Sequence, residues 1–597
     1  MYNKSIIILT LLLGILTQGC NQPKMNGNGA VSSTSRVASQ VGIDILKNGG
    51  NAFDAIVATG FALAVTSPSN GNLGGGGFLV ARTANGELVS LDFREKAPKL
   101  SFDTMFLDEN NNYVRELALF SHISSGVPGT VNGLIKIFND YGSGKFTLNE
   151  LLQPAISLAD NGFAIEPTAA IGFDANKNHF INDEGSKKLF IKNRDGVISD
   201  LENRFKNGEL SLKKYETMLN EVDEWKAGDI FIQKDLANTL RRIAENGNKG
   251  FYQGKTAQYI VDEMKLNNGL ISYQDLKNYD SVYRNPIVGS YRDYNIVSMG
   301  PPSSGGVLLI QMLNMLENFD IKNMERNSTE FVHLLTEIQR LAYADRAVHL
   351  GDPDFWNNPI DVLTSKEYAA ERLNLISLEK ATPSTNIAAG TTKKESVETT
   401  HYSVMDKYGN TVGITTTINL SYGNKKIVDR AGFLLNNEMD DFAAKPNAPN
   451  AFGLIGGEAN AIRPYKRPLS SMSPTLVVDK NGQSILTVGA AGGSRIITAV
   501  LQIIISVIDH DLNIQEAIDL PRTHSQWLPD FIFYEKDALD QNKIDELKQL
   551  NHAFYSDKNL PGNFYLARTH GIQRKDGLFI SGADKRGALN GNEAITY

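Results

Sequence analysis

The sequence of 597 residues predicts an α+β fold, in which sheets built from hairpins are covered by helices. Apolar side chains recur at three- and four-residue spacing over residues 331–342, which predicts an amphipathic helix. Two stretches, residues 401–419 and 475–488, each read as a pair of strands joined by a polar turn that contains glycine. Helices and hairpins are therefore both abundant, and the chain shows no internal repeat.

The first twenty residues predict a secretory signal that ends at Cys20. One lysine is their only charge, and the apolar run Ile6–Leu16 is too short to span a bilayer. A cysteine directly after a glycine resembles a bacterial lipobox, in which the new N-terminal cysteine is acylated. We expect a protein of the bacterial cell envelope, on the periplasmic side, anchored by lipid through Cys20. Ordinary secretion is the alternative.

Composition excludes several classes of function. A net charge of -8 argues against a nucleic-acid partner, because nucleic-acid binding needs a clustered basic face. Cys20 is the only cysteine, which excludes an intramolecular disulfide and every CxxC motif. The nine histidines lack the spacing of zinc ligands, and neither a GxxxxGK[ST] loop nor a GxSxG elbow occurs. We expect no metal and no organic cofactor.

The elements before the hairpins follow in order. Residues 21–34 are polar and predict a tether, so the folded body is expected to begin near Ser35. Glycines at 71–77 form a tight turn into an apolar strand. Residues 180–228 are charged and weakly patterned, as in a helical or loop excursion. Residues 377–398 lose all apolar periodicity and predict a long exposed loop, which is uncommon inside a folded body and is usually functional or disordered.

The last elements are strands and one apolar helix. The first hairpin is expected from residues 401–405 and 411–419, and the second from 475–479 and 484–488. A glycine-rich loop over 489–494 follows, with Ser494 as the N-cap of a buried helix.

At the junction Glu398–Thr399 a predicted loop ends and a predicted strand begins. A threonine in this position could act as a nucleophile. If the chain were cut before Thr399, that residue would carry both a hydroxyl nucleophile and a free α-amine. The pKa of such an amine, about 7.7–8.0, suits a general base at neutral pH. These residues alone favour the simpler interpretation, a strand that starts with threonine.

Nine motifs in order reverse that preference. They are GNLGGGGF at 71–78, LDFRE at 91–95, GVPGT at 126–130, GPPSSGG at 300–306, YADR at 343–346, TTHYSV at 399–404, LLNNEMDDF at 434–442, RPLSSMSPT at 467–475 and GGSRII at 492–497. With them the chain resembles the gamma-glutamyltranspeptidase family of N-terminal-nucleophile hydrolases. The resemblance implies a four-layer αββα sandwich that cleaves itself into a large and a small subunit.

The resemblance also implies the chain's organisation and its nucleophile. Thr399 matches the family nucleophile, and Thr400 is the rival on composition alone. The segments are then a signal peptide (1–20), a tether (21–34), a large subunit (35–398) and a small catalytic subunit (399–597), which associate as a heterodimer. Self-processing would cut the bond between Glu398 and Thr399.

The remaining site residues are matched in the same way. Thr417 matches the residue that hydrogen-bonds the nucleophile, and Gly492 and Gly493 match the oxyanion hole. Thr417 and Asn419 are two apart on the second strand, which places them on one side. The matches for the substrate's α-carboxylate are Arg94, Ser470 and Ser471, and those for its α-ammonium are Asn419, Glu438 and Asp441.

Some relatives carry Gln at position 438. Residues 446–457 match a lid loop, with Phe452 where relatives often have Tyr.

The function implied is a gamma-glutamyltranspeptidase and glutathione hydrolase. Its substrates would be glutathione and other γ-glutamyl compounds, with water or an amino acid or peptide as acceptor. Two alternatives remain: a glutaryl- or cephalosporin-type acylase of the same fold, and an unprocessed binding lipoprotein with no catalytic activity.

Overall fold

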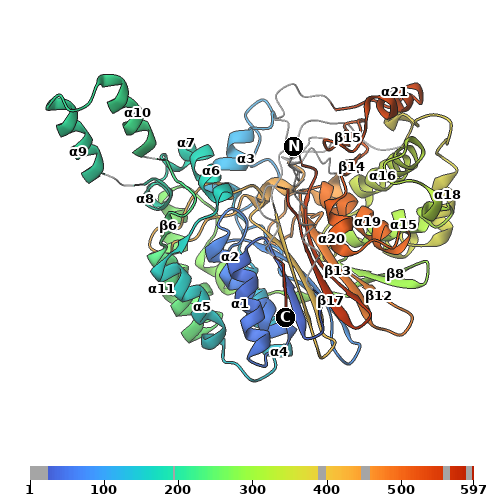
Figure 1. The fold of residues 1–597 in the computed structure, drawn as a ribbon, viewed down its shortest axis with the longest axis horizontal. Coiled ribbons are helices and arrows are strands. Elements are labelled where there is room, and N and C mark those ends of the chain that lie inside the picture. The colour runs from blue at the N-terminus through green and yellow to red at the C-terminus, as the bar shows by residue number, and fades with distance from the viewer. Residues whose placement is uncertain are drawn as a thin grey trace, which may run out of the picture.

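Two stacked sheets form the centre of the protein, and helices cover both outer faces (Figure 1). The computed structural model describes residues 25–192, 195–222, 224–387, 399–444, 457–555, 565–586 and 594–597. The order helices, sheet, sheet, helices confirms the predicted α+β class and the four-layer αββα sandwich.

The first sheet carries the start of the predicted small subunit near its middle. Its seven antiparallel strands are, in spatial order, β18 (Ile595–Thr596), β2 (Gly29–Ser32), β10 (Thr400–Asp406), β11 (Thr411–Thr417), β3 (Gly76–Arg82), β4 (Leu88–Asp92) and β7 (Val282–Tyr283). The first predicted hairpin is therefore confirmed as β10 and β11. Both strands are buried along their whole length, as expected of strands covered on both faces.

The second sheet is also seven-stranded and antiparallel. Its order is β1 (Met25–Asn26), β17 (Leu578–Ala583), β16 (Arg568–Lys575), β13 (Ser484–Ala491), β12 (Thr475–Val478), β9 (Tyr294–Ser298) and β8 (Ile287–Tyr291). The second predicted hairpin is confirmed as β12 and β13, although β13 continues to Ala491 where a loop was expected.

Direct contacts join the two sheets. The hydroxyl of Ser403 on β10 lies 3.2 Å from that of Thr487 on β13. The ring of His401 lies so close to Gly489 on β13 that a Cβ at this glycine would overlap it. A glycine is thus required at this contact between the two inner faces.

Helices α1 (Arg36–Lys47), α2 (Ala52–Thr66), α4 (Thr130–Tyr141), α5 (Leu148–Asn161) and α11 (Lys234–Asn246) form the layer over the first sheet. Their apolar side chains share one core cluster with β3, β10 and β11. Residues 52–65 of α2 are buried on every side, which explains the unbroken run of small and apolar residues there.

Helices α15 (Gly305–Leu316), α16 (Thr329–His349), α19 (Arg495–Ile508) and α20 (Ile514–Asp519) form the layer over the second sheet. They share a core cluster with strands β9, β12 and β13. The predicted helix at residues 331–342 is present within α16, but it is not amphipathic. Residues 331–346 are all buried, because α21 (Gln541–Gln549) and neighbouring segments cover its outer side.

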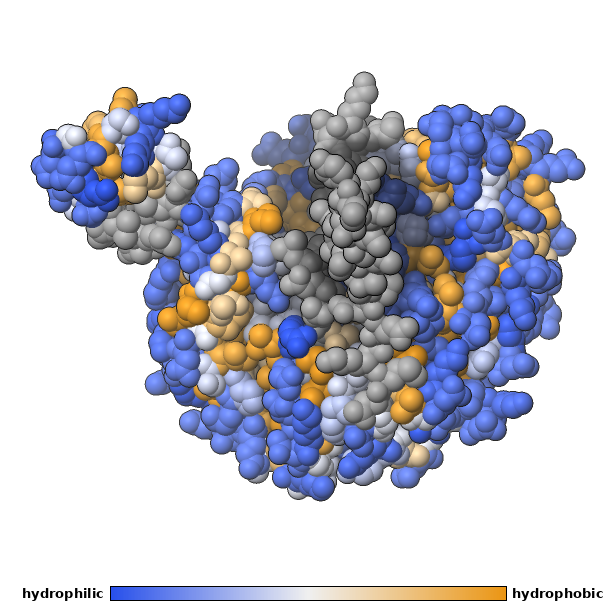
Figure 2. All heavy atoms as spheres, viewed as in Figure 1, coloured by the Kyte–Doolittle hydropathy of each residue, from blue (hydrophilic) through white to orange (hydrophobic). Residues whose placement is uncertain are grey.

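The remaining elements connect or extend these layers. They are α3 (Arg115–Phe120), β5 (Phe163–Ala164), α6 (Pro167–Ala175), α7 (Lys177–Phe180), α8 (Glu184–Phe190), α9 (Asp195–Lys206), α10 (Leu212–Val222), β6 (Ile230–Phe231), α12 (Lys249–Tyr252), α13 (Gly254–Leu266), α14 (Tyr273–Lys277), α17 (Ile360–Leu363), α18 (Lys366–Leu373), β14 (Thr523–His524) and β15 (Phe533–Tyr534). The charged stretch 180–228 is largely helical, and Figure 2 shows α9 and α10 standing away from the body.

The predicted tether differs from the structure. Residues 29–32 form the buried strand β2, which pairs with β10 and with β18. The folded body therefore begins before Ser35, because this short segment completes the first sheet. Among the described residues, no helix combines the length and apolar character needed to cross a membrane. Cys20 and the predicted signal lie outside the described residues.

Candidate active site

Thr399 is the last residue before β10, and the hairpin register fixes its neighbour. Thr400 pairs with Thr416, so Thr399 lies opposite Thr417 at the end of β11. The amide of Asn70 donates a hydrogen bond to the Thr399 carbonyl over 3.1 Å. Thr399 is only 6% exposed, and its position is thus set by the sheet and by the loop after α2.

One cavity brings the predicted residues together from both subunit segments. It is lined by Thr399, Thr417, Asn419, Glu438, Asp441, Ser470, Ser471, Gly493 and Arg94. Of the predicted site residues, Gly492 alone is not in its wall, and it adjoins Gly493. Residues far apart in the sequence therefore converge where the resemblance placed them.

Gly492 and Gly493 form the turn between β13 and α19. Their φ angles are 152° and 56°, a region that side-chain-bearing residues rarely adopt. In the part of the chain that the structure describes, the backbone N–H of Gly493 donates no hydrogen bond. The turn leads directly into the N-terminus of α19, where the helix dipole favours negative charge. Ser494 stands at the N-cap, as predicted, but its hydroxyl bonds to Gln526 rather than capping the helix.

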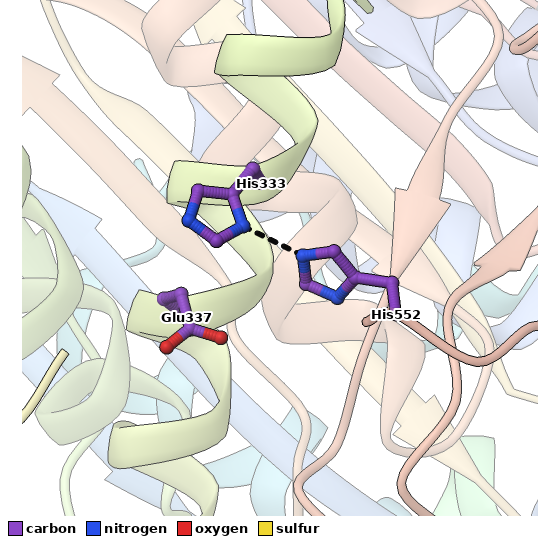
Figure 3. A group of neighbouring side chains, drawn as sticks. All are labelled: His333, Glu337 and His552. Carbon is purple, nitrogen blue, oxygen red and sulfur yellow. Dashed lines mark hydrogen bonds between the residues drawn. The ribbon is translucent and has the colours of Figure 1, made fainter. Parts of the chain in front are cut away.

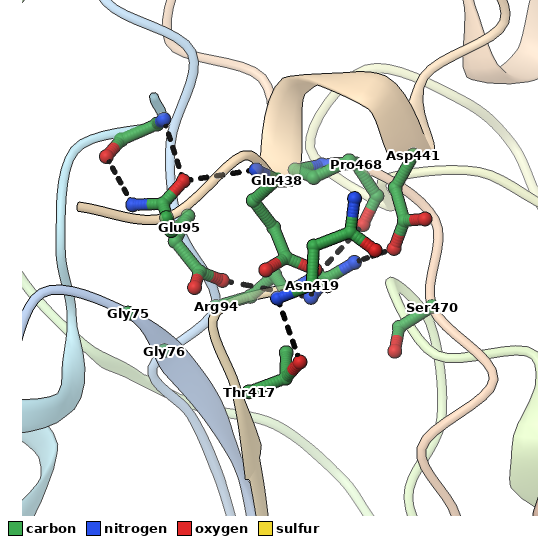
Figure 4. Close-up of polar contacts among 12 residues, drawn as sticks. Gly75, Gly76, Arg94, Glu95, Thr417, Asn419, Glu438, Asp441, Pro468 and Ser470 are labelled. Carbon is green, nitrogen blue, oxygen red and sulfur yellow. Dashed lines mark hydrogen bonds and ion pairs between the residues drawn. The ribbon is translucent and has the colours of Figure 1, made fainter. Parts of the chain in front are cut away.

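Arg94 lies at the centre of an ionic cluster (Figure 4). Its guanidinium pairs with Glu438 and Asp441 through short contacts, and lies 3.5 Å from Glu95. The residues predicted for the two ends of a zwitterionic ligand thus pair with each other. One buried cation faces three carboxylates, so the cluster carries an excess of acceptors.

Several oxygens of these side chains make no hydrogen bond. Within the described residues, Oδ1 of Asn419 and Oε2 of Glu438 are buried and make no hydrogen bond, and the same holds for both carboxylate oxygens of Glu95. Such orphaned acceptors cost free energy unless a donor reaches them. An ammonium group carries three donors and a positive charge, which matches what this corner lacks.

Asn419 reaches the cavity by a different route from the one predicted. Strand β11 ends at Thr417, and Asn419 lies beyond it with φ of 71°. Its backbone N–H bonds to the Thr417 hydroxyl over 2.8 Å, and its amide donates to the carbonyl of Asn437. These bonds hold the side chain so that its free oxygen is fixed in place.

Burial sets the protonation of the carboxylates. Desolvation raises the pKa of Glu95 to about 7, although the Arg94 guanidinium acts in the opposite direction. Desolvation also raises the pKa of Glu438 well above its ordinary value, and that of Asp441 shifts in the same direction. Burial thus favours the protonated forms of these carboxyls, and a bound cation would favour their release of protons.

Sequence reasoning missed Arg346 as a site residue. It projects from α16 into the same cavity, is 4% exposed, and donates to the hydroxyls of Ser304 (2.9 Å) and Ser471 (3.5 Å). Burial lowers its pKa to about 10, so it remains charged at neutral pH. The YADR motif was the available signal. The motif identified the residue, but it did not indicate that the Arg346 side chain would point from α16 into the cavity.

The structure also contains two groups of possible metal ligands among the described residues: His333 with Glu337 and His552, and His122 with Asp183 and Glu263. In the first group, shown in Figure 3, the rings of His333 and His552 are hydrogen-bonded to each other over 2.6 Å. Glu337 accepts from the backbone of Thr382 and pairs with Arg340.

These contacts occupy Nδ1 of His333, Nε2 of His552 and the Glu337 carboxylate, whereas Nδ1 of His552 has no partner among the described residues. The other nitrogen of His333 bonds to the Ser377 carbonyl over 2.8 Å. Together these bonds attach the beginning of the predicted loop 377–398 to α16. Glu398, the rest of that loop from residue 388, and the predicted lid apart from Gly457 lie outside the described residues.

Comparison with known proteins gives one consistent result. A family model described as Gamma-glutamyltranspeptidase matches residues 38–593. The chain is 47% identical over 510 residues to the glutathione hydrolase proenzyme of Escherichia coli (strain K12), covering 85% of this chain and 83% of that protein.

Two solved structures extend the comparison. Helicobacter pylori gamma-glutamyltranspeptidase is 43% identical with a TM-score of 0.54, and the match covers 60% of this chain and 94% of that one. A cephalosporin acylase from Bacillus halodurans reaches a TM-score of 0.77 over 97% of this chain and 98% of its own, at 24% identity. The second likeness concerns the fold alone.

Proposed function

The chain belongs to the gamma-glutamyltranspeptidase family, and we propose how its own residues carry out that family's reaction. It is an enzyme that transfers or hydrolyses γ-glutamyl groups and is made as a proenzyme. Within this activity we assign the nucleophile to Thr399. The observation that carries the assignment is the single cavity that joins Thr399, a glycine oxyanion turn and acceptors suited to an ammonium.

The first half-reaction forms an ester on Thr399. Its hydroxyl oxygen attacks the γ-carbonyl carbon of the donor, while the residue's own α-amine takes the hydroxyl proton. The backbone N–H of Gly493, with that of Gly492, stabilises the oxyanion. When the tetrahedral intermediate collapses, the C–N bond breaks and the proton passes from the α-amine to the leaving amine.

The second half-reaction releases the γ-glutamyl group. Water, or the amine of an amino acid or peptide, attacks the ester carbonyl, and the bond to the Thr399 oxygen breaks. The α-amine takes a proton from the attacking water or amine and delivers one to that oxygen. Hydrolysis and transfer thus differ only in the nucleophile, and every proton is exchanged through one group.

Recognition of the glutamyl end rests on charge matching. The α-ammonium lies against Asn419, Glu438 and Asp441, and the α-carboxylate lies against Arg94, Ser470 and Ser471. Ligand binding would then replace the present pairing of Arg94 with the two acidic side chains. The ligand carries one charge of each sign, so it adds no net charge of its own to the cavity.

Formation of the nucleophile requires cleavage at Glu398–Thr399. In the proenzyme, the Thr399 hydroxyl attacks the Glu398 carbonyl, and an N-to-O acyl shift gives an ester that water hydrolyses. The products are the large and small chains and a free α-amine on Thr399.

We further assign the protein to the periplasmic side of the cell envelope, held by an acyl group on Cys20. The supporting observation is the signal-like sequence before this single cysteine. Labelling with a radioactive fatty acid should mark the large chain, and Cys20→Ser should abolish the label and release the protein into the soluble periplasmic fraction. Soluble wild-type protein with no label would contradict the anchor.

One comparison of substrates tests the function. The enzyme should turn over γ-glutamyl-p-nitroanilide much faster than glutaryl-p-nitroanilide, because the second lacks the α-ammonium. A preference for the glutaryl compound would support the acylase alternative. Ligand binding by a single intact chain, with turnover of neither substrate, would support a non-catalytic binding protein.

A further inference from the structure

His333, Glu337 and His552 form a buried cluster that shares no residue with the cavity around Thr399 (Figure 3). Each side chain offers one ligand atom, and these three atoms all lie within 4.8 Å of one another. The three residues are 3%, 0% and 4% exposed, in that order. Two imidazoles and one carboxylate are a ligand set that zinc accepts in proteins. The reaction assigned above leaves this cluster without a role.

The cluster is assembled by tertiary packing. His333 and Glu337 are four residues apart on α16, which makes them neighbours on one face of the helix. His552 follows α21 and lies 219 residues from His333 in the sequence. The spacing of the histidines along the chain does not indicate such a site, because one member is a carboxylate and another comes from a distant segment.

The hydrogen bonds of His333 determine which of its nitrogens can bind a cation. A carbonyl oxygen only accepts, so Nε2 of His333 carries the proton that bonds to the Ser377 carbonyl over 2.8 Å. Nδ1 of the same ring therefore presents a lone pair. A metal-bound histidine usually donates its other N–H to a carbonyl or carboxylate in this way, which fixes the ring. His333 is thus held in the orientation and tautomer of a metal ligand.

Nε2 of His552 lies 2.6 Å from this lone pair and donates the proton of the hydrogen bond between the rings. A cation between the two nitrogens would replace that proton. The proton can move to Nδ1 of His552, which has no partner among the described residues, so no hydrogen bond is broken there. Tetrahedral zinc holds two nitrogen ligands about 3.3 Å apart, so the rings need to separate by only about 0.7 Å.

The charges around the cluster favour a cation. Arg340 pairs with both Glu337 and Asp530, so one guanidinium faces two carboxylates. Within the described residues, Oε2 of Glu337 accepts only from the backbone N–H of Thr382, over 3.1 Å. This oxygen retains a lone pair for a metal ion. The excess of negative charge would be offset by a bound divalent cation.

The cluster also joins the two chains that the proposed cleavage would produce. Its two residues on α16 belong to the large chain, and His552 belongs to the small chain. Other contacts between the chains lie nearby: the N–H of Ala381 donates to the carbonyl of Leu550 over 2.6 Å, and the hydroxyl of Ser384 donates to that of Trp527 over 2.6 Å. The late part of the large chain is therefore packed on the small chain at this place.

We propose that His333, Glu337 and His552 bind one divalent metal ion that prefers nitrogen ligands, such as Zn²⁺, and that this ion links the large and small chains. Burial of all three ligands suits a structural metal, and three protein ligands leave one position for water. The link between chains rests on the self-processing proposed above, whereas metal binding by the three residues does not.

Zinc binding by the purified enzyme, without an affinity tag, tests the site. Metal is first removed with a chelator, the protein is equilibrated with Zn²⁺, and bound zinc is measured by mass spectrometry against protein concentration. Wild type should retain one zinc ion per pair of chains. His552→Gln and Glu337→Gln should each weaken binding at least about 100-fold, because loss of even an outer partner of a ligand costs about 10–100-fold.

His122→Gln is the matched control, because it alters the other group of possible ligands. In that group Asp183 already accepts from the backbone N–H groups of Ser186 and Ile427, at 2.9 and 3.2 Å, so this variant should retain zinc like wild type. Turnover of γ-glutamyl-p-nitroanilide shows that each variant has folded. Equal zinc retention by wild type, His552→Gln and Glu337→Gln would overturn the metal site and leave the proposed enzymatic function intact.

Separation of the chains tests the link. In gel filtration at increasing urea concentration, zinc-loaded wild type should remain a pair of chains to a higher concentration than the chelator-treated protein. The two curves should coincide in His552→Gln. Coincident curves for a wild type that binds zinc would overturn the link. A purified protein that binds zinc as one uncleaved chain would support the metal site and contradict the proposed processing.

Discussion

The acidic residues around Arg94 decide which donors this enzyme accepts. Three carboxylates surround one cation, and oxygens of Asn419 and Glu438 are buried without partners. The free-energy cost of leaving these buried oxygens without hydrogen bonds is offset when an ammonium group binds to them. Donor specificity is therefore expected to reside in these acceptors more than in the arginine that faces them.

A single substitution tests this view. Glu438→Gln keeps an acceptor oxygen but replaces a charge-assisted hydrogen bond with a neutral one, which weakens ammonium binding by about 1 kcal/mol. The KM for γ-glutamyl-p-nitroanilide should rise about fivefold with little change in kcat. Glu458→Gln, at an exposed position, serves as the control. Equal KM values for wild type and Glu438→Gln would exclude a direct contact with the ammonium.

The raised pKa of Glu95 predicts a pH dependence of donor binding. Below about pH 7 this carboxyl is protonated and contributes no negative charge near the ammonium; above it, the charge is present. The donor's KM should therefore rise as the pH falls from 8 to 6, and Glu95→Gln should flatten that rise. A KM profile of the same shape in both proteins would contradict the assignment.

Sequence reasoning found most of this cavity but not all of it. Thr399, Arg94 and Gly493 lie within motifs that name their positions, so the resemblance sufficed. Arg346 also lies in a motif, but its role depends on α16 packing across the site from a distant part of the chain. The direction in which a side chain of a buried helix points depends on how the helix packs against the rest of the fold. A single sequence does not reveal this packing.

At the scale of elements, the hairpins were predictable and the N-terminal strand was not. β10 and β11 are adjacent in sequence, so their alternation and turn indicate the pairing directly. β2 is short, and its partner β10 lies more than 300 residues away, as the pairing of Val31 with Val404 shows. Local pattern carries no information about such a pairing, and a polar, glycine-rich context suggested a tether.

The close approach of β10 and β13 gives a prediction for the sheet interface. The His401 ring is held between Thr415 and Ser403, so it cannot move to admit a methyl group at Gly489. Gly489→Ala should lower the free energy of unfolding by about 1–3 kcal/mol through overpacking. Denaturant unfolding of the purified protein measures the change.

Gly27 provides the control for this substitution. A Cβ at Gly27 would make only ordinary contacts, at 3.8 Å, so Gly27→Ala should be nearly neutral. If Gly489→Ala is as stable as Gly27→Ala, the two sheets do not approach as closely as described.

For the whole molecule, buried neutral histidines link stability to pH. His570 is 2% exposed, both of its ring nitrogens lack partners among the described residues, and burial lowers its pKa to about 4. The unfolded chain binds a proton at this residue below about pH 6.5, whereas the folded chain does not. This histidine therefore destabilises the fold increasingly as the pH drops from 6.5 toward 4.

Replacing this histidine should make the protein more resistant to acid. The stability of His570→Leu relative to wild type should increase by about 2 kcal/mol between pH 7 and pH 5, because each pKa unit corresponds to about 1.4 kcal/mol. Urea unfolding at the two pH values measures the difference. His349→Leu is the control, and a pH-independent difference for His570→Leu would contradict a neutral buried ring.

The central claim is that Thr399 becomes the N-terminal residue of a separate chain and acts there as the nucleophile. N-terminal sequencing of the smaller chain of the purified enzyme tests it most directly. The expected sequence is Thr-Thr-His-Tyr-Ser, beginning at Thr399, and Thr399→Ala should remain a single uncleaved, inactive chain. A small chain that begins at Thr400 or elsewhere, or an active enzyme that remains uncleaved, would contradict it.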